Sequence, residues 1–432
     1  MMNKAMATMT AVSMAVAARA AFFSADGLVT DKTPGWRFEA SGAKDSRTFN
    51  PLEGWYPDKG GKLVSPRIPI PTANAYYRIS FTASAPERAY EAIAFYDAAG
   101  VMVADNYDVV YPGGTNRYGR VVFAQEGVKE AEVFFQSPTG CTVADVRFET
   151  ATAEEAAAWC DEVYARLPPV TVGPAGDAFL SAPKTLDALK TGKPWRILLL
   201  GDSIVQDAFH SQFHALVKRA YPKSVVTWLV SVRGSTGCWF YRIPENFGQW
   251  VASYRPDCVI VGGISNWPKA TDEFPVTGND AIFEVGERIR AAGAELIVMS
   301  PALSVDTRLP KGAEAMASVP VRAYDAAAEA EALGLTGYAP SEPDAGLSPE
   351  RFAELKSGCA ERGWGFVDAF TPTYRWLYES GRPYQFYSRD HVHSGELGKQ
   401  IIGHVLLAFL RAIPTDATPT VETETANRQH GQ

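Results

Sequence analysis

The chain has 432 residues, which is long for one domain, so two globular units are the first expectation. Hydrophobic residues make up 46% and charged residues 21%, which argues against a disordered chain, a collagen-like fibre or a coiled coil. The net charge of -8 has the wrong sign to attract a phosphate backbone. We therefore expect a folded chain with no nucleic-acid partner.

The first 20 residues have the pattern of a signal peptide. Lys4 precedes a modest apolar run, and Ala18-Arg19-Ala20 matches the A-x-A pattern of signal peptidase sites. Residues 1–20 are predicted to direct export to the periplasm, the cell surface or the medium, although an ordinary N-terminal helix is the alternative. Later segments fall short of the roughly 18 apolar residues that a membrane-spanning helix needs, so no integral membrane segment is expected.

Residues 21–150 have the pattern of β-strands. Apolar and polar residues alternate with period 2, and turn residues such as Pro112-Gly113-Gly114 separate the runs. The predicted strands are 75–83, 91–97, 120–124, 132–136 and 142–149. This segment is expected to be an all-β, jelly-roll-like sandwich. Its aromatic residues could stack on sugar rings or fill the core; they are Trp36, Trp55, Tyr56, Tyr107 and Tyr111.

The segment 151–193 is predicted to connect two domains. Residues 153–167 have helical composition and end at Pro168-Pro169, where a helix cannot continue, so the rest is expected to be linker. Residues 194–413 alternate short apolar runs with helical stretches, which indicates a parallel sheet covered on both faces. The runs are 197–200, 225–230, 258–261, 296–299 and 365–367. The polar, Thr-rich tail 414–432 is predicted to be disordered.

Ser203 occupies a position suited to a nucleophile. It follows the apolar run 197–200 and precedes a predicted helix over 204–221, so it lies between strand and helix. The free N–H groups of the first helical turn would favour negative charge developing there. The alternative is that Ser203 only caps the helix.

Two further loops deliver glycine and polar residues to the same sheet edge. One contains Gly234 in the stretch 231–237, and the other contains Asn266 in the stretch 262–266. A glycine N–H and an asparagine amide are suitable donors to the oxyanion of an acyl-transfer reaction. Either loop could instead be an ordinary turn.

A loop before the predicted last helix, 395–411, contains an aspartate and two histidines. The three-residue spacing of Asp390 and His393 lets the carboxylate bind one imidazole nitrogen while the other faces a serine, as a triad requires. His391 is adjacent to Asp390 and is expected to point elsewhere, so His393 is predicted to be the base.

These four segments, within roughly residues 195–411, resemble the SGNH hydrolases, a branch of the GDSL esterase and lipase superfamily. The resemblance implies a flavodoxin-like three-layer α/β fold with a parallel sheet. It implies Ser203 as nucleophile, with Asp390 and His393 completing the triad. The oxyanion hole would consist of Ser203, Gly234 and Asn266.

The third block departs from the family pattern. It usually reads Gly-x-Asn-Asp, whereas Asn266 here stands one place later and is followed by Trp267. The sandwich lies outside this resemblance and looks only loosely like the jelly-roll carbohydrate-binding domains that accompany exported esterases.

Metal and disulfide chemistry are not expected. His210 and His214 stand four residues apart on the predicted helix but lack a third ligand in sequence, so they are interpreted as packing or surface residues. The five cysteines are widely spaced, which disfavours a metal site and a disulfide framework and leaves one disulfide possible. They are Cys141, Cys160, Cys238, Cys258 and Cys359.

The sequence thus predicts an exported serine esterase without cofactor or metal. An acyl-Ser203 intermediate would form and be hydrolysed by water that His393 activates. An acyl ester, expected to be acetyl, on carbohydrate is the preferred substrate, with the sandwich as a tether that small-ester hydrolysis does not need. A lipase, a thioesterase and a noncatalytic carbohydrate-binding protein are the alternatives.

Overall fold

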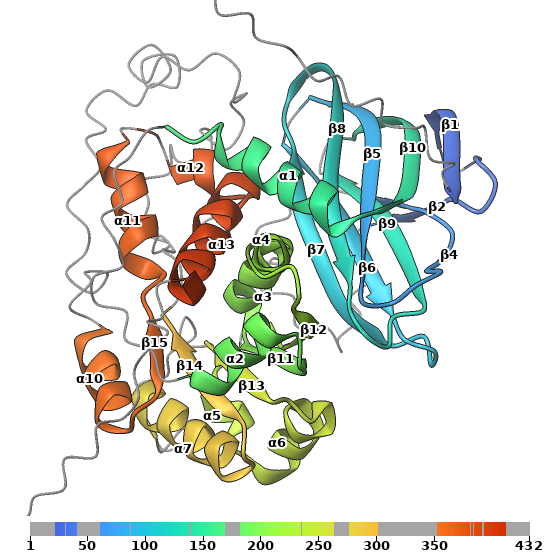
Figure 1. The fold of residues 1–432 in the computed structure, drawn as a ribbon. Helices are drawn as coiled ribbons and strands as arrows, with labels where there is room; N and C mark the ends of the chain where they lie inside the picture. The colour runs from blue at the N-terminus through green and yellow to red at the C-terminus, as the bar shows by residue number, and fades with distance from the viewer. Residues whose placement is uncertain are drawn as a thin grey trace, which may run out of the picture.

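The computed structural model shows two units side by side, a β-sandwich and an α/β unit (Figure 1). It describes residues 22–30, 32–40, 61–86, 88–137, 140–168, 182–234, 236–262, 276–300, 352–380, 382, 384–390 and 393–411. The predicted signal peptide, the tail 414–432, Asn266 and His391 lie outside the described residues.

The N-terminal unit consists of antiparallel sheets. One has the order β1-β10-β5-β8, and the other has the order β2-β3-β9-β6-β7 with β4 pairing β9. Their bounds are β1 (Phe23–Val29), β2 (Arg37–Ala40), β3 (Gly61–Val64), β4 (Ile68–Pro69), β5 (Ala75–Ala85), β6 (Ala89–Tyr96), β7 (Met102–Val110), β8 (Gly113–Ala124), β9 (Glu130–Ser137) and β10 (Thr142–Ala151). In β5, the side chains of Ile79 and Phe81 are buried whereas Arg78 is exposed. The period-2 pattern therefore predicted this β unit correctly.

The second unit is built on a five-stranded parallel sheet of order β12-β11-β13-β14-β15. The strands are β11 (Pro194–Gly201), β12 (Val225–Val232), β13 (Cys258–Val261), β14 (Glu295–Met299) and β15 (Gly365–Val367). In chain order this is 2-1-3-4-5, the flavodoxin-like arrangement. Leu198, Leu199 and Leu200 are fully buried, because helices cover both faces of the sheet. The predicted flavodoxin-like fold is confirmed.

Helices cover the two faces of this sheet. Alternate strand residues belong to two apolar clusters: Leu199 packs with residues of α2, α3, α4 and α13, and Leu198 packs with residues of α5, α7, α10 and α11. The helices are α1 (Ala153–Tyr164), α2 (Pro183–Thr191), α3 (Ser203–His210), α4 (Phe213–Ala220), α5 (Cys238–Tyr241), α6 (Pro244–Trp250), α7 (Gly278–Ala291), α10 (Ala353–Glu361), α11 (Phe370–Glu379), α12 (Tyr384–Tyr387) and α13 (Glu396–Arg411), with a 3-10 turn at Ala252–Tyr254. None of the helices within the described ranges is long and apolar enough to cross a membrane.

The segment that connects the units contains a second helix, α2, where the sequence predicted a linker. The helix α1 begins with a capping box between Thr152 and Glu155, and it packs against α4 and α13. Within the predicted linker, the described residues include α2, which packs on β11 and β12. The single helix predicted over 204–221 is two helices, because Gln212 adopts a left-handed conformation with φ 62°.

Candidate active site

Ser203 is the first residue of α3 and follows the carboxyl end of β11. Its neighbour Asp202 is the N-cap, and one carboxylate oxygen of Asp202 accepts the N–H groups of Ile204 (3.0 Å) and Val205 (3.4 Å). Ser203 is therefore not the cap. Its hydroxyl remains available for another partner.

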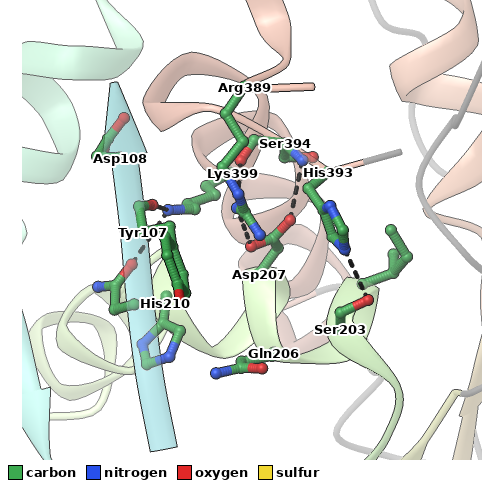
Figure 2. Close-up of polar contacts among 12 residues, drawn as sticks. Tyr107, Asp108, Ser203, Gln206, Asp207, His210, Arg389, His393, Ser394 and Lys399 are labelled. Carbon is green, nitrogen blue, oxygen red and sulfur yellow. Dashed lines mark hydrogen bonds and ion pairs between the residues drawn. The ribbon is translucent and has the colours of Figure 1, made fainter. Parts of the chain in front are cut away.

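That partner is His393, as Figure 2 shows. Nε2 of His393 lies 2.8 Å from Oγ of Ser203, and Nδ1 lies 2.8 Å from Oδ2 of Asp390. The backbone N–H of His393 donates to Oδ1 of Asp390 at 2.7 Å. The structure thus brings together three of the site residues expected from the sequence.

The environment of Asp390 fixes its charge. Burial alone would raise the pKa of Asp390, but the charge and hydrogen bonds of His393, together with the charge of Arg389, bring this pKa below its ordinary value. An ionised carboxylate accepts the Nδ1–H of His393. Nε2 is then the imidazole nitrogen that can accept the hydroxyl hydrogen bond of Ser203.

The loop after β12 is bound to the end of β11. The hydroxyl of Tyr241 donates to the carbonyl of Gly201 at 2.5 Å and accepts the N–H of Arg233 at 3.0 Å. Gly234, the next residue, is exposed, and a Cβ built on it would meet no atom within 4 Å. Because Asn266 lies outside the described residues, the oxyanion-hole assignment of Gly234 and Asn266 stays a prediction.

The end of β13 requires a glycine. A Cβ on Gly262 would lie 2.4 Å from Cγ2 of Val205, on the first turn of α3. The N–H of Gly262 donates to the carbonyl of Leu200 at 2.9 Å, which continues the pairing of β13 with β11. Close approach of α3 to the sheet thus sets the direction in which Ser203 leaves it.

Asp207, one helical turn after Ser203, is a residue that the sequence analysis missed. Its side chain is buried. Oδ1 accepts a hydrogen bond from Nη1 of Arg389 at 2.6 Å, and Oδ2 accepts one from the N–H of Ser394 at 2.9 Å (Figure 2). Nη1 of Arg389 also donates to the carbonyl of Ser394 at 2.9 Å. An aspartate inside an apolar helix, four residues after the candidate nucleophile, is the signal that could have identified it.

His210 and His214 are packed in the interior. Nδ1 of His214 lies 2.7 Å from the hydroxyl of Tyr76, and its ring contacts Phe123. Burial lowers the pKa of His214 to about 3, and burial together with the charges of Lys399 and other cations lowers that of His210 well below its usual range. Across the described ranges, there is no group of three or more His, Cys, Asp or Glu side chains that could hold a metal ion.

The remaining candidates from the sequence are the cysteines and the aromatic residues, of which Trp55 and Tyr56 lie outside the described residues. All five cysteines, each of which is described, are free thiols. Trp36 is buried and stacks on Phe135 of the sandwich core, and Tyr107 packs against Phe134. These two aromatic rings are therefore part of the packing rather than an open sugar-binding face.

No protein-family model and no curated protein matches this chain. Solved structures of similar fold include a two-domain esterase (CEX) active on acetylated mannans, with 16% identity and a TM-score of 0.38, over 56% of this chain and 55% of that one. An acetyl xylan esterase, AlAXEase, has 11% identity and a TM-score of 0.35, over 50% and 100%. A GDSL-like lipase from Bacteroides thetaiotaomicron has 15% identity and a TM-score of 0.31, over 60% and 98%.

The match spans about half the length of the two-domain esterase. These are likenesses of fold. The strand order 2-1-3-4-5, with Ser203 where β11 meets α3, is the arrangement that the resemblance in sequence implied. The chain thus has the flavodoxin-like fold that this resemblance implied.

Proposed function

We propose that the protein is a serine esterase with Ser203 as its nucleophile. The observation that carries this proposal is the continuous hydrogen-bonded chain from Asp390 through His393 to Ser203. Few arrangements other than an activated serine bring these three groups together at about 2.8 Å with the carboxylate ionised.

The hydrogen-bonding roles of Ser203 and His393 define the steps of the proposed reaction. Oγ of Ser203 attacks the ester carbonyl carbon while Nε2 of His393 takes its proton. The tetrahedral intermediate expels the alcohol, which takes that proton from His393, and leaves an acyl-Ser203. Water then attacks the acyl carbon as His393 takes one of its protons, and His393 returns this proton to Oγ of Ser203 as the carboxylic acid leaves.

The oxyanion needs donors that already point at it. As the first residue of α3, Ser203 has a backbone N–H without an intrahelical acceptor. We assign it, with Gly234 and Asn266, to the oxyanion hole. The helix N-terminus adds a favourable dipole.

We further propose that the protein is exported and acts on acetyl esters of carbohydrates. The predicted signal peptide and the sandwich beside the hydrolase unit support this substrate class, since exported polymer-degrading enzymes need to engage large substrates. Acetylated mannan and xylan are the substrates to test first, because two of the similar structures are named for them.

The test is hydrolysis by the purified protein of nitrophenyl esters of increasing chain length and of acetylated polysaccharides, with the released acid measured. We expect acetate to be the preferred acyl group and acetic acid to be released from the polysaccharide. Preference for long acyl chains would contradict the carbohydrate substrate in favour of a lipase. No hydrolysis of any ester would contradict the esterase itself.

A further inference from the structure

The hairpin that carries Asp390 and His393 receives hydrogen bonds from the β-sandwich. We call the described residues 388–390 and 393–394 the catalytic hairpin, because Ser388 and Ser394 form a β-bridge at its base. Nη2 of Arg88 donates to the carbonyl of Ser388 at 2.7 Å. The hydroxyl of Tyr90 donates to the carbonyl of Arg389 at 3.1 Å.

These bonds join residues about 300 positions apart in the chain. Arg88 precedes β6 directly and Tyr90 is the second residue of that strand, whereas the hairpin precedes α13. Arg88 and Ser388 are both buried, with 8% and 3% of their surface exposed. A charged donor to a carbonyl in a buried site makes a strong, directional bond, so Arg88 restrains the backbone of Ser388.

The other side of the catalytic hairpin is bound by α3. Asp207 accepts the guanidinium of Arg389 and the N–H of Ser394, as described above. From outside the hairpin, Arg389 is bound at its side chain by Asp207 and at its carbonyl by Tyr90. The residue after it is Asp390, so its position determines where the carboxylate meets His393.

The sandwich is itself fixed to the helices that flank the hairpin. Nζ of Lys399, on α13, donates to Oδ1 of Asn106 at 3.1 Å and to the carbonyl of Tyr107 at 2.6 Å (Figure 2). Gln206, on α3, is hydrogen-bonded to Asp105 of the same strand, β7. β6 pairs with β7 along its length, so Arg88 and Tyr90 extend from a strand that is held in register with α3 and α13.

We propose that Arg88 and Tyr90 are positioning residues of the esterase, and that the sandwich is a structural part of its active site. They fix the carbonyls of Ser388 and Arg389 so that Asp390 and His393 stay aligned with Ser203. This inference rests on the proposed function. It opposes the expectation that the hydrolase works without the sandwich, since removing β6 would remove both donors.

The direct test measures kcat and KM of Arg88→Ala, Arg88→Lys and Tyr90→Phe on nitrophenyl acetate. Arg88→Ala should lower kcat about 10²-fold with little change in KM, because a misplacement of about 1 Å affects the reacting groups rather than substrate binding. Tyr90→Phe, which loses one neutral donor, should lower kcat about threefold to tenfold. Arg88→Lys should recover part of the loss, since an ammonium can still donate to Ser388.

Arg78→Ala is the matched control, because Arg78 is an exposed arginine on β5 of the same sandwich. It should keep wild-type kcat and KM. Thermal unfolding of every variant shows whether a loss of activity follows from unfolding. If Arg88→Ala does not fold, the kcat of Tyr90→Phe tests the positioning role instead, because this variant loses only a single hydroxyl.

A fluorophosphonate gives a second readout that does not depend on the natural substrate. Oγ of Ser203 forms a bond to phosphorus as the P–F bond breaks, fluoride leaves and His393 takes the serine proton. The labelling rate should fall in Arg88→Ala by a factor similar to that in kcat, because both reactions need His393 aligned with Ser203.

The outcomes separate this inference from the proposed function. A wild-type protein that neither hydrolyses esters nor reacts with the probe would contradict the esterase. An active wild type together with unchanged kcat in folded Arg88→Ala or Tyr90→Phe would overturn the positioning role alone. A rise in KM without a fall in kcat, or equal losses in Arg88→Lys and Arg88→Ala, would also overturn it.

Discussion

Asp202 and Asp207 show how single residues prepare Ser203 for reaction. Asp202 takes over the helix cap, which frees the hydroxyl of Ser203 for His393. Asp207, one turn along α3, binds the base of the catalytic hairpin through Arg389 and Ser394. The proposed nucleophile and the catalytic hairpin are therefore attached to the same helix.

Asp207→Ala should destabilise the protein by about 3–5 kcal/mol, because it removes the closest carboxylate partner of the buried Arg389. Both side chains are nearly inaccessible, 3% for Asp207 and 7% for Arg389. Urea unfolding measures the loss. Asp187→Ala, at an exposed aspartate on α2, should change the free energy of unfolding by less than about 0.5 kcal/mol. Equal stability of the two variants would contradict the role of Asp207.

The two histidines of the hairpin region should differ in their effect on activity. His393→Ala should remove nearly all hydrolysis, about 10⁴-fold or more in kcat, since the general base is lost. His391→Ala should keep wild-type kcat, because His393 already bonds to both Asp390 and Ser203. Steady-state kinetics on nitrophenyl acetate distinguishes them, and a dispensable His393 would reassign the base.

The site residues that could be predicted from the sequence are those defined by local spacing. Asp390 and His393 are three residues apart, and Ser203 follows an apolar strand, so each leaves a local pattern. Asp207 leaves only the signal of an aspartate inside an apolar helix, and its pairing with Arg389 leaves none, because the two residues are more than 180 positions apart and buried ion pairs have no periodicity. Their roles emerge only when the chain is folded.

At the scale of elements, the contact between α3 and the end of β13 depends on Gly262, which has no side chain. Val205 packs where a Cβ of residue 262 would be, and β-branched valine has little rotamer freedom in a helix. The first turn of α3 can therefore approach β13 closely, which directs Ser203 toward the hairpin.

Gly262→Ala should cost about 1–3 kcal/mol through overpacking, and it should lower kcat because α3 is displaced. Val205→Ala in the same chain should restore much of kcat by giving the new methyl group room. Gly248→Ala is the control, since a Cβ there meets no atom within 4 Å and alanine is favourable in α6. Activity equal to wild type in Gly262→Ala would show that the contact does not orient Ser203.

The parallel strands were predictable because each is a continuous apolar run, and the flavodoxin-like order 2-1-3-4-5 is what the resemblance to the SGNH hydrolases implied. The break between α3 and α4 was not, because Gln212 in a left-handed conformation interrupts an otherwise regular apolar pattern. The helix α2 was assigned to a linker, although its Leu186 and Leu189 are buried and Leu189 belongs to the apolar cluster on one face of the sheet. Its shortness concealed the amphipathic pattern.

At the scale of the whole molecule, one apolar core extends through both units. Tyr76 and Phe123 of the sandwich belong to the same buried cluster as Phe209 and Trp228 of the α/β unit. His214 lies among them, with its Nδ1 bonded to Tyr76. Contacts between residues this far apart in sequence leave no local pattern, so the sequence suggested separable domains.

This core should make stability depend on pH. His214 has its pKa lowered from 6.5 to about 3 by burial, so the unfolded chain binds a proton below pH 6.5 that the folded chain does not. Stability is therefore fully present above pH 6.5 and falls as the pH falls toward 3. At pH 5 the loss from one such group is about 2 kcal/mol.

A double variant, Tyr76→Phe/His214→Phe, isolates this contribution. Replacing both hydrogen-bond partners by apolar rings of similar shape should leave stability at pH 7 nearly unchanged. Between pH 7 and pH 5, urea unfolding should show a loss about 2 kcal/mol smaller than in the wild type. The same loss in both proteins would show that His214 does not set the pH dependence.

The most direct test of the esterase is the activity of Ser203→Ala. The substitution removes only the hydroxyl that lies 2.8 Å from His393, at a helix start already capped by Asp202, so the variant should fold with an unchanged melting temperature. Hydrolysis of nitrophenyl acetate should fall about 10⁴- to 10⁶-fold in kcat. A folded Ser203→Ala protein that keeps more than about a tenth of the wild-type kcat would contradict Ser203 as the nucleophile.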